Sequence, residues 1–309
     1  MQKLITILLL LFLSAAIYGQ KLYVKTFGNT KDLAIIFLHG GPGYNSVGFE
    51  VSTAQKLSDL GFFVIVYDRR GEGRSEDPKA KFTFEQSFDD LNSIYKKYKI
   101  KKAVLLGHSF GGIVASLYAE KFPKKVSVLV LLAAPISLQA TFKNIIDRCK
   151  LIYQTTGDDI NMSNIEILEN MDTASIQYSS YCFIHAMQNN FYTPMNISEE
   201  AKNIYSGLKS DTLLIKYGSL LTKEPTMGFW RNEKYTSIDL NDTIKKLKSG
   251  GTTIYGIYGM DDGLFSVKQV EELSTIIGKE NMQYYLDCSH NVYFDKQSDF
   301  LVQIKKWLK

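Results

Sequence analysis

One serine stands where a strand would turn sharply into a helix. Ser109 lies within Gly107-His-Ser-Phe-Gly111, after the apolar segment 102–106 and before the helix-like segment 113–122. At such a turn the hydroxyl is exposed at the edge of a sheet, and the flanking glycines let strand and helix approach closely. The pattern predicts that Ser109 is a nucleophile.

A serine hydroxyl needs a base, and the base needs an acid that orients it. In this arrangement the order along the chain is serine, acid, histidine. Of the four histidines, His290 is the one that follows the last predicted strand, so we predict that it is the base. The acid should follow Gly259, where the spacing favours Asp262 over its neighbour Asp261, which can instead shape the turn.

Acyl transfer places negative charge on a carbonyl oxygen, which backbone N–H groups can stabilise. The glycine-rich segment 38–43, Leu-His-Gly-Gly-Pro-Gly, follows an apolar strand and can bring its backbone close to a substrate. We predict an oxyanion hole formed by the N–H groups of Gly41 and Phe110. The same glycines also suit a tight turn, which would place the donor, and His39 is expected to brace this loop.

The elements that must position these residues follow an α/β pattern. Near-continuous apolar runs at 33–38, 62–67, 103–106 and 126–132 are typical of strands buried on both faces. Amphipathic stretches lie between them. The alternation predicts an α/β architecture, a mostly parallel sheet with helices on both faces.

The alternation stops in the middle of the chain and resumes near residue 252. Residues 138–240 have helical character and no long buried-strand run. We therefore predict a first core part at 20–137, a helical cap inserted at 138–240 and a second core part at 241–309.

The amino-terminal residues 1–19 have the pattern of a secretory signal peptide: a positive start, an apolar run and a small-residue end. The alternative, an uncleaved membrane anchor, is disfavoured because a spanning helix needs about 20 apolar residues. The sequence predicts export to the periplasm or beyond, without stable membrane insertion after cleavage.

Charge and cysteine content exclude some classes of protein. The 36 basic and 32 acidic residues are too evenly balanced to indicate nucleic-acid binding. Cys149, Cys182 and Cys288 lack metal-site spacing and are predicted to be mostly buried free thiols, with a Cys149–Cys182 disulfide as the alternative. We expect neither a metal nor an organic cofactor.

Three segments together resemble the proline iminopeptidase family of serine peptidases, which has the α/β-hydrolase fold: 39–43, 67–75 and the segment around Ser109. The second matches that family's D-x-R-G-x-G-x-S signature, in which we expect Asp68 and Arg70 to form a structural ion pair. The segment around Ser109 has GHSFGG where the iminopeptidases typically have a GGSWG form.

The resemblance implies an aminopeptidase that binds a free amino terminus through acidic cap residues beside aromatic ones. The acidic residues available in the insert are Glu166, Glu169, Asp172, Glu199, Glu200, Glu224 and Glu233. The aromatic residues at 178–183 and 191–192, with His185, can line a pocket or belong to the core, and 228–230 has the same ambiguity.

Together these features predict a serine hydrolase that transfers an acyl group to water. The first hypothesis is an exported iminopeptidase-like enzyme acting on short peptides, which needs a carboxylate in its cap pocket. The alternative is an esterase or lactonase type of small-molecule hydrolase, with an apolar pocket. A non-catalytic binding protein is disfavoured by the complete set of catalytic residues, and dehalogenase or epoxide hydrolase chemistry by a serine in place of a carboxylate.

Overall fold

The computed structural model describes residues 22–218 and 221–309, so the predicted signal peptide at 1–19 lies outside the described residues. Seven strands form one sheet in the order β1-β3-β2-β4-β5-β6-β7. β1 runs antiparallel to β3, and the other neighbouring pairs are parallel. The strands are β1 Val24–Phe27, β2 Leu33–Leu38, β3 Phe62–Tyr67, β4 Ala103–His108, β5 Val126–Leu132, β6 Thr253–Gly259 and β7 Met282–Tyr285. The predicted fold class is confirmed.

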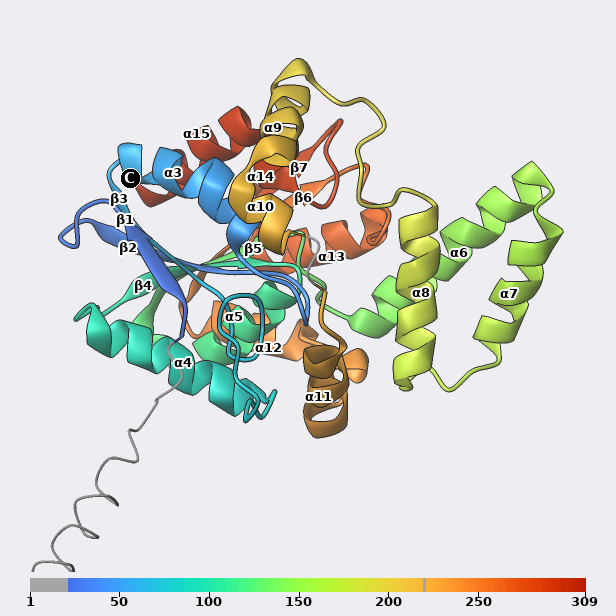
Figure 1. The fold of residues 1–309 in the computed structure, drawn as a ribbon, viewed down its shortest axis with the longest axis horizontal. Helices are drawn as coiled ribbons and strands as arrows, with labels where there is room; N and C mark the ends of the chain where they lie inside the picture. Colours follow the sequence, from blue (N-terminus) through green and yellow to red (C-terminus); the bar gives the residue numbers. More distant parts are fainter. Residues whose placement is uncertain (1–21, 219–220) are drawn as a thin grey trace, which may run out of the picture.

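Helices cover both faces of the sheet because alternate strand residues point in opposite directions. In β2, Ile36 packs into one hydrophobic core and Ile35 into the other. The first core is covered by α4 Phe84–Lys97, α5 Phe110–Lys121, α12 Asn241–Ser249 and α13 Val267–Ile277. The second is covered by α2 Val47–Phe49, the π-helical η1 Glu50–Ala54, α3 Gln55–Asp59, α14 Val292–Asp295 and α15 Gln297–Leu308 (Figure 1).

Between β5 and β6, the described residues form helices joined by loops. The helices are α6 Leu138–Thr156, α7 Asp159–Glu169, α8 Ile176–Gln188, α9 Glu199–Ser210, α10 Thr212–Tyr217 and α11 Lys223–Glu233, followed by α12. The two ends of the insert meet, since Ser137 and Asp239 form an antiparallel bridge and Leu240 N donates to Ile136 O at 2.7 Å.

The insert divides into parts rather than forming one lid. α6, α7 and α8 form an arm that projects from the body of the molecule (Figure 1). α9 instead lies against the core, where the Tyr205 hydroxyl donates to Asp295 at 2.6 Å and its ring packs on Phe294. Residues of α6, of α8 and of the segment after α11 reach the region beside Ser109.

Two further observations concern the described part of the chain. Its three cysteines are free and buried, with no disulfide between Cys149 and Cys182. No helix within residues 22–218 and 221–309 is both long and apolar enough to cross a membrane.

Candidate active site

Ser109 occupies the turn between β4 and α5 in a strained backbone conformation. Its φ of 51° and ψ of −124° lie in a region that non-glycine residues rarely adopt. The Ser109 N–H donates to Leu132 O at 2.9 Å, and the Gly112 N–H donates to Ser109 O at 2.8 Å. The turn is therefore held from both sides, as the sequence pattern predicts.

The glycines beside Ser109 are required by close backbone approach. A Cβ atom on Gly107 would lie 2.6 Å from the Cα of Gly112, and one on Gly111 would lie 2.1 Å from Leu38 O. Both distances are far shorter than a carbon contact allows. The start of α5 consequently packs directly onto the ends of β4 and β2.

His290 and Asp262 are joined by a hydrogen bond although 28 positions separate them. The Nδ1 of His290 lies 2.8 Å from Asp262 Oδ2, and both side chains are buried. The other oxygen, Oδ1, accepts from Leu264 N at 3.0 Å. With Nδ1 directed at the carboxylate, the Nε2 of His290 is the nitrogen left for chemistry.

Asp261, the alternative acid, faces a different partner. Its Oδ2 accepts from Met195 N at 2.9 Å, and its own N–H donates to Cys288 O at 2.9 Å. It thus connects the end of β6 to the insert and to the loop before His290. Asp262 is the carboxylate that contacts the histidine.

The loop that carries His290 is held by the residue preceding the serine. The Nε2–H of His108 donates to His290 O at 3.0 Å, and the two rings lie 4.9 Å apart. Burial and the neighbouring His290 lower the pKa of His108 to about 3, so the ring is neutral. Among the described residues, no hydrogen bond joins the Ser109 hydroxyl to His290; such bonds often tighten only in the substrate complex.

Gly41 lies in the loop after β2 with φ of 118°, and its peptide bond to Pro42 is cis. Gly41, Ser109 and Phe110 line one cavity. The structure thereby brings together the serine and the two residues that were predicted to donate backbone N–H groups.

Arg69 braces this loop, a role that the sequence did not single out. Its guanidinium donates to the carbonyl oxygens of His39 and Gly40, at 2.6 Å for the latter, and pairs with Glu72 at 2.9 Å. Glu72 in turn accepts from Gly43 N at 2.8 Å. Because a trans peptide points its C=O and N–H in opposite directions, the hold on Gly40 O turns the Gly41 N–H away from Arg69.

His39 completes the brace, as expected. Its Nε2 accepts from Arg69 N at 3.0 Å, so its Nδ1 carries the proton and donates to Gly40 O at 2.8 Å. Burial, with the nearby Arg69 charge, lowers the pKa of His39 well below its usual value. The ring is therefore neutral and acts as a structural hydrogen-bonding group.

The expected ion pair between Asp68 and Arg70 is wrong. Asp68 pairs with Arg74 at 2.7 Å and also accepts from Ser46, while Arg70 reaches Asp90 on α4. The turn at 71–73 folds the chain back, so the side chain that meets Asp68 comes from six residues later. Burial is the largest single influence and opposes ionisation of Asp68, but the hydrogen bonds from Arg74 and Ser46 and the charge of Arg74 act together against it, and the pKa of the carboxyl is lowered.

The cavity beside Ser109 is small and uncharged. Its volume is about 30 Å³, enough for a few water molecules. Its lining residues are Gly41, Ser109, Phe110, Ile113, Pro135, Leu138, Thr141, Phe183, Tyr235, Leu264 and Phe265. None carries a charge at neutral pH.

The acidic residues of the insert lie elsewhere. Glu169 pairs with Lys150, Glu199 with Lys202, and Glu233 accepts from Phe84 N. Glu200 accepts from Ser298, and the remaining three, Glu166, Asp172 and Glu224, are exposed. The structure brings none of the seven into the cavity that contains Ser109.

The aromatic residues of the insert divide between pocket and core. Phe183 lines the cavity, and the Tyr192 ring meets His290 edge-on at 5.2 Å. Tyr178 and Phe191 are buried in the main core, whereas Tyr181 is exposed. The segment 228–230 contributes Phe229, whose ring packs against Phe110 at 5.1 Å.

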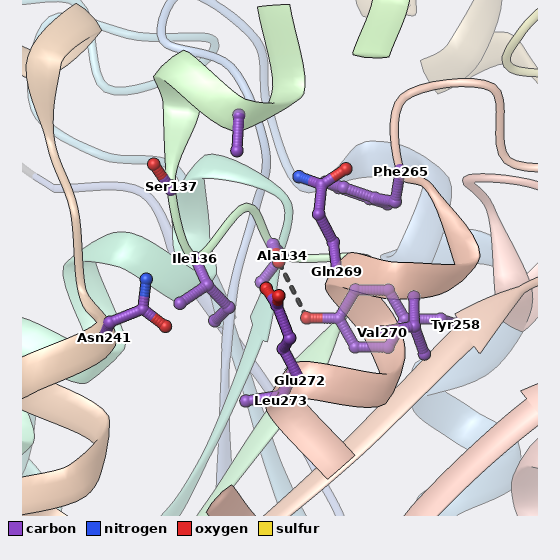
Figure 2. Close-up of a pocket in the computed structure, with 11 residues that line it drawn as sticks. Ala134, Ile136, Ser137, Asn241, Tyr258, Phe265, Gln269, Val270, Glu272 and Leu273 are labelled. Atoms are coloured by element: carbon purple, nitrogen blue, oxygen red, sulfur yellow. Dashed lines mark hydrogen bonds between the residues drawn. The ribbon is translucent and has the colours of Figure 1, made fainter. Parts of the chain in front are cut away.

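A second pocket lies beside the first and shares Phe265 with it (Figure 2). Ala134 and Ile136 line this second pocket, whereas Pro135 between them lines the Ser109 cavity. The Tyr258 hydroxyl donates to Ala134 O at 2.7 Å, the dashed line in Figure 2. Glu272 supplies a carboxylate here, outside the lining of the Ser109 cavity.

Residues 34–297 match the family model described as alpha/beta hydrolase fold, which is most of the chain. The chain belongs to the α/β-hydrolase fold family. The resemblance to proline iminopeptidases is also confirmed at the level of relatives. The proline iminopeptidase of Saccharolobus solfataricus is 32% identical to this chain over 181 residues. The match covers 53% of this chain and 55% of that protein, so it spans little more than half of the relative's length. That of Lactobacillus delbrueckii subsp. lactis is 23% identical over 298 residues, covering 93% of this chain and 94% of that protein.

Solved α/β-hydrolase structures include both peptidase-related and esterase neighbours. A proline iminopeptidase-related protein from Thermus thermophilus superposes with a TM-score of 0.64 and 21% identity, covering 93% of this chain and 92% of its own. An esterase from Exiguobacterium antarcticum gives 0.63 and 19%, with 94% and 97% covered. At these identities the likeness establishes the fold alone.

Proposed function

We propose that this α/β hydrolase is a serine esterase that cleaves carboxylic esters through an acyl-enzyme at Ser109. The observation that carries the proposal is the uncharged cavity shared by Ser109, Gly41 and Phe110. Burying a charged group without a partner is costly, so the cavity suits a neutral acyl group.

In the proposed first step, the Ser109 oxygen attacks the ester carbonyl while His290 Nε2 takes the hydroxyl proton. The hydrogen bond from Nδ1 to Asp262 supports this assignment because it orients the ring and stabilises the imidazolium. The C–O bond of the ester then breaks, and the leaving alcohol receives the proton from His290.

The oxyanion formed in this step would be held by the Gly41 and Phe110 N–H groups. Donors fixed before the reaction need no reorganisation as the charge develops, and one such donor typically contributes about 10²–10³-fold in kcat. In the second step His290 takes a proton from water, the hydroxide attacks the acyl carbon, and the Ser109 oxygen leaves with the proton as the acid product forms.

An iminopeptidase-like aminopeptidase is the second candidate. It is favoured by the relatives at 32% and 23% identity and by the 39–43 and 67–75 segments. Binding a protonated amino terminus in a buried pocket needs an anionic partner. The cavity lining supplies none, which is why we place the ester reaction first.

The test is turnover of paired substrates by the wild-type protein and by Ser109→Ala. The panel contains 4-nitrophenyl esters of short acids, prolyl and alanyl arylamides, and the same arylamides with a blocked amino group. We expect ester turnover that the Ser109→Ala variant loses. Cleavage of arylamides only when their amino group is free would establish the second candidate instead.

We also propose that the protein is exported, on the basis of the sequence pattern at 1–19. Sequencing the amino terminus of the protein recovered outside the cytoplasm tests this. A new terminus near Gln20 is expected, and an intact Met1 on protein retained inside would contradict it.

A further inference from the structure

One buried hydroxyl in the Ser109 cavity has no partner. Thr141 lies in the first turn of α6 with 1% of its surface exposed, and it lines the same cavity as Ser109. Within the described part of the chain, its Oγ1 makes no hydrogen bond. Buried polar groups in folded proteins are nearly always bonded, and an unpaired one carries a desolvation penalty.

Other helical threonines of this chain behave differently. The hydroxyls of Thr155, Thr156 and Thr275 donate to the carbonyl four residues earlier, at 2.7, 2.9 and 2.9 Å. For Thr141 that carbonyl belongs to Ser137 and accepts only the backbone N–H of Thr141, at 3.0 Å. The hydroxyl is therefore not engaged in the local bond that would normally satisfy it.

The other described residues around the cavity supply no hydrogen-bond partner for the Thr141 hydroxyl. The cavity side chains from Leu138, Phe183, Leu264 and Phe265 are hydrocarbon. The hydroxyl of Tyr235, the one phenolic group among the cavity's described lining residues, interacts with Ser179. The remaining buried unpartnered atoms of the described residues belong to Tyr67, Ser127 and Gln303, which do not line this cavity.

We propose that the Thr141 hydroxyl binds the acyl part of the substrate, and that this substrate is a hydroxyacyl ester. The inference rests on the esterase proposed above and specifies its substrate class. A threonine hydroxyl is both a donor and an acceptor, so a second hydroxyl complements it. A charged group is unsuitable because the lining contains no counter-charge, and a plain alkyl chain would leave Thr141 unpaired.

The test compares 4-nitrophenyl butanoate with its 2-hydroxy and 3-hydroxy analogues on wild type, Thr141→Val and Thr141→Ser. We expect the wild type to favour one hydroxy ester by about tenfold in kcat/KM, the effect of one additional hydrogen bond. Thr141→Val keeps the shape of the side chain and should lose this preference, so that the ratio of kcat/KM for the favoured hydroxy ester to kcat/KM for butanoate falls to about one. Thr141→Ser should retain the preference, and the matched control Thr155→Val should leave the turnover of all three esters unchanged.

Thermal unfolding gives a readout that does not depend on activity. Removing an unpaired buried hydroxyl relieves its penalty, so Thr141→Val should raise Tm by about 2 °C. A fall in Tm would show that the hydroxyl is already bonded before substrate binds, to the protein or to water, and would overturn the inference.

The kinetic outcomes separate the two proposals. If the wild type cleaves butanoate but shows no hydroxy preference, or if Thr141→Val lowers turnover of all three esters equally, the Thr141 inference fails and the esterase stands. If wild type and Ser109→Ala are equally inactive on every ester, the esterase itself fails, and the substrate class falls with it.

Discussion

The strand-end loops and the helical insert meet at the cavity beside Ser109, but their polar groups are held differently. In the loops, His290 is bonded to Asp262, and Arg69 is bonded to the loop that precedes Gly41. On the insert side, Thr141 enters the same cavity without a partner among the described residues. The groups that we propose to act in the reaction are hydrogen-bonded within the protein, whereas the Thr141 hydroxyl of the insert has no such partner among the described residues.

This difference has an energetic meaning. Fixed donors and acceptors lower the barrier because they need no rearrangement during the reaction. An unpaired buried hydroxyl affects substrate selection instead. Its desolvation penalty is relieved only when a ligand forms a hydrogen bond with it, so a ligand without a hydrogen-bonding group at that position binds less well. The rate of the chemical step would then depend on the loops at the strand ends, and the selection of substrate would depend on the insert.

The largest effect is expected at one of the two neighbouring aspartates that follow β6, Asp261 and Asp262. Asp262→Asn should lower kcat about 10⁴-fold because the histidine loses the carboxylate that orients it and stabilises its charge. Asp261→Asn is the matched control, since its amide oxygen can still accept from Met195 N, and it should leave kcat nearly unchanged. Steady-state kinetics on an ester distinguishes them, and equal losses in both variants would contradict the assignment.

The next largest effect is expected at Arg69, which braces the loop containing Gly41. Arg69→Met leaves Glu72 as an unpaired charge in the core and should lower the free energy of unfolding by about 3–5 kcal/mol. The Arg69 and Glu72 side chains are 2% and 0% exposed. Lys143, whose side chain is 75% exposed in its pair with Asp147, is the control, with at most about 0.5 kcal/mol expected for Lys143→Met.

Denaturant unfolding measures both values. The double variant Arg69→Met with Glu72→Gln should recover part of the stability. Its kcat should remain below that of the wild type, because the carbonyl oxygens of His39 and Gly40 still lack the hydrogen bonds from Arg69. Full recovery of kcat in the double variant would show that Arg69 acts on stability alone.

A smaller effect concerns pH. The folded-state pKa of His108, about 3, lies below its ordinary value of 6.5, so between these values the unfolded chain binds a proton that the folded chain excludes. Stability should therefore fall as pH drops from 6.5 toward 3, by up to about 1.4 kcal/mol per pH unit. His39 contributes in the same direction.

His108→Gln should flatten this dependence, as measured by urea unfolding between pH 7 and 5. The raised carboxyl pKa values of Asp90 and Asp295 act in the opposite direction but are common to both proteins. Identical slopes for the variant and the wild type would contradict a neutral, buried His108.

The smallest effect is expected at the acidic residues of the insert. Glu166→Gln and Glu224→Gln should leave KM unchanged for esters and for arylamides, because these side chains are exposed and lie outside the cavity lining. A large rise in KM for an arylamide with a free amino group would show that a cap carboxylate reaches the substrate. The conclusion that the insert supplies no charged group to the substrate would then be wrong.

The core was predictable because its requirements are local. The glycines around Ser109 follow from backbone contacts of 2.1 to 2.6 Å that no side chain could tolerate. The apolar strand runs predicted the sheet, and chain order combined with spacing selected His290 and Asp262 from a few candidates. The glycine and strand rules involve a handful of consecutive residues each, and chain order requires no knowledge of spatial contacts.

The other features depend on contacts between distant residues. The partner of Asp68 is Arg74 because a turn reverses the chain, and Arg69 meets Gly40 only when β2 and β3 pair. Nothing in the spacing marks Thr141, which has the sequence context of an ordinary helical threonine. Similarly, the divided course of the insert follows from the packing of α9 on α14, which the helical pattern alone does not specify.

The most direct test of the central claim, that Ser109 is a nucleophile activated by His290, is covalent labelling. A fluorophosphonate is incubated with wild type, Ser109→Ala and His290→Ala, and the adducts are mapped by peptide mass spectrometry. The account predicts one adduct, on the peptide containing Ser109, absent in Ser109→Ala and strongly slowed in His290→Ala. An adduct on another residue, or labelling of Ser109→Ala at the wild-type rate, would contradict it.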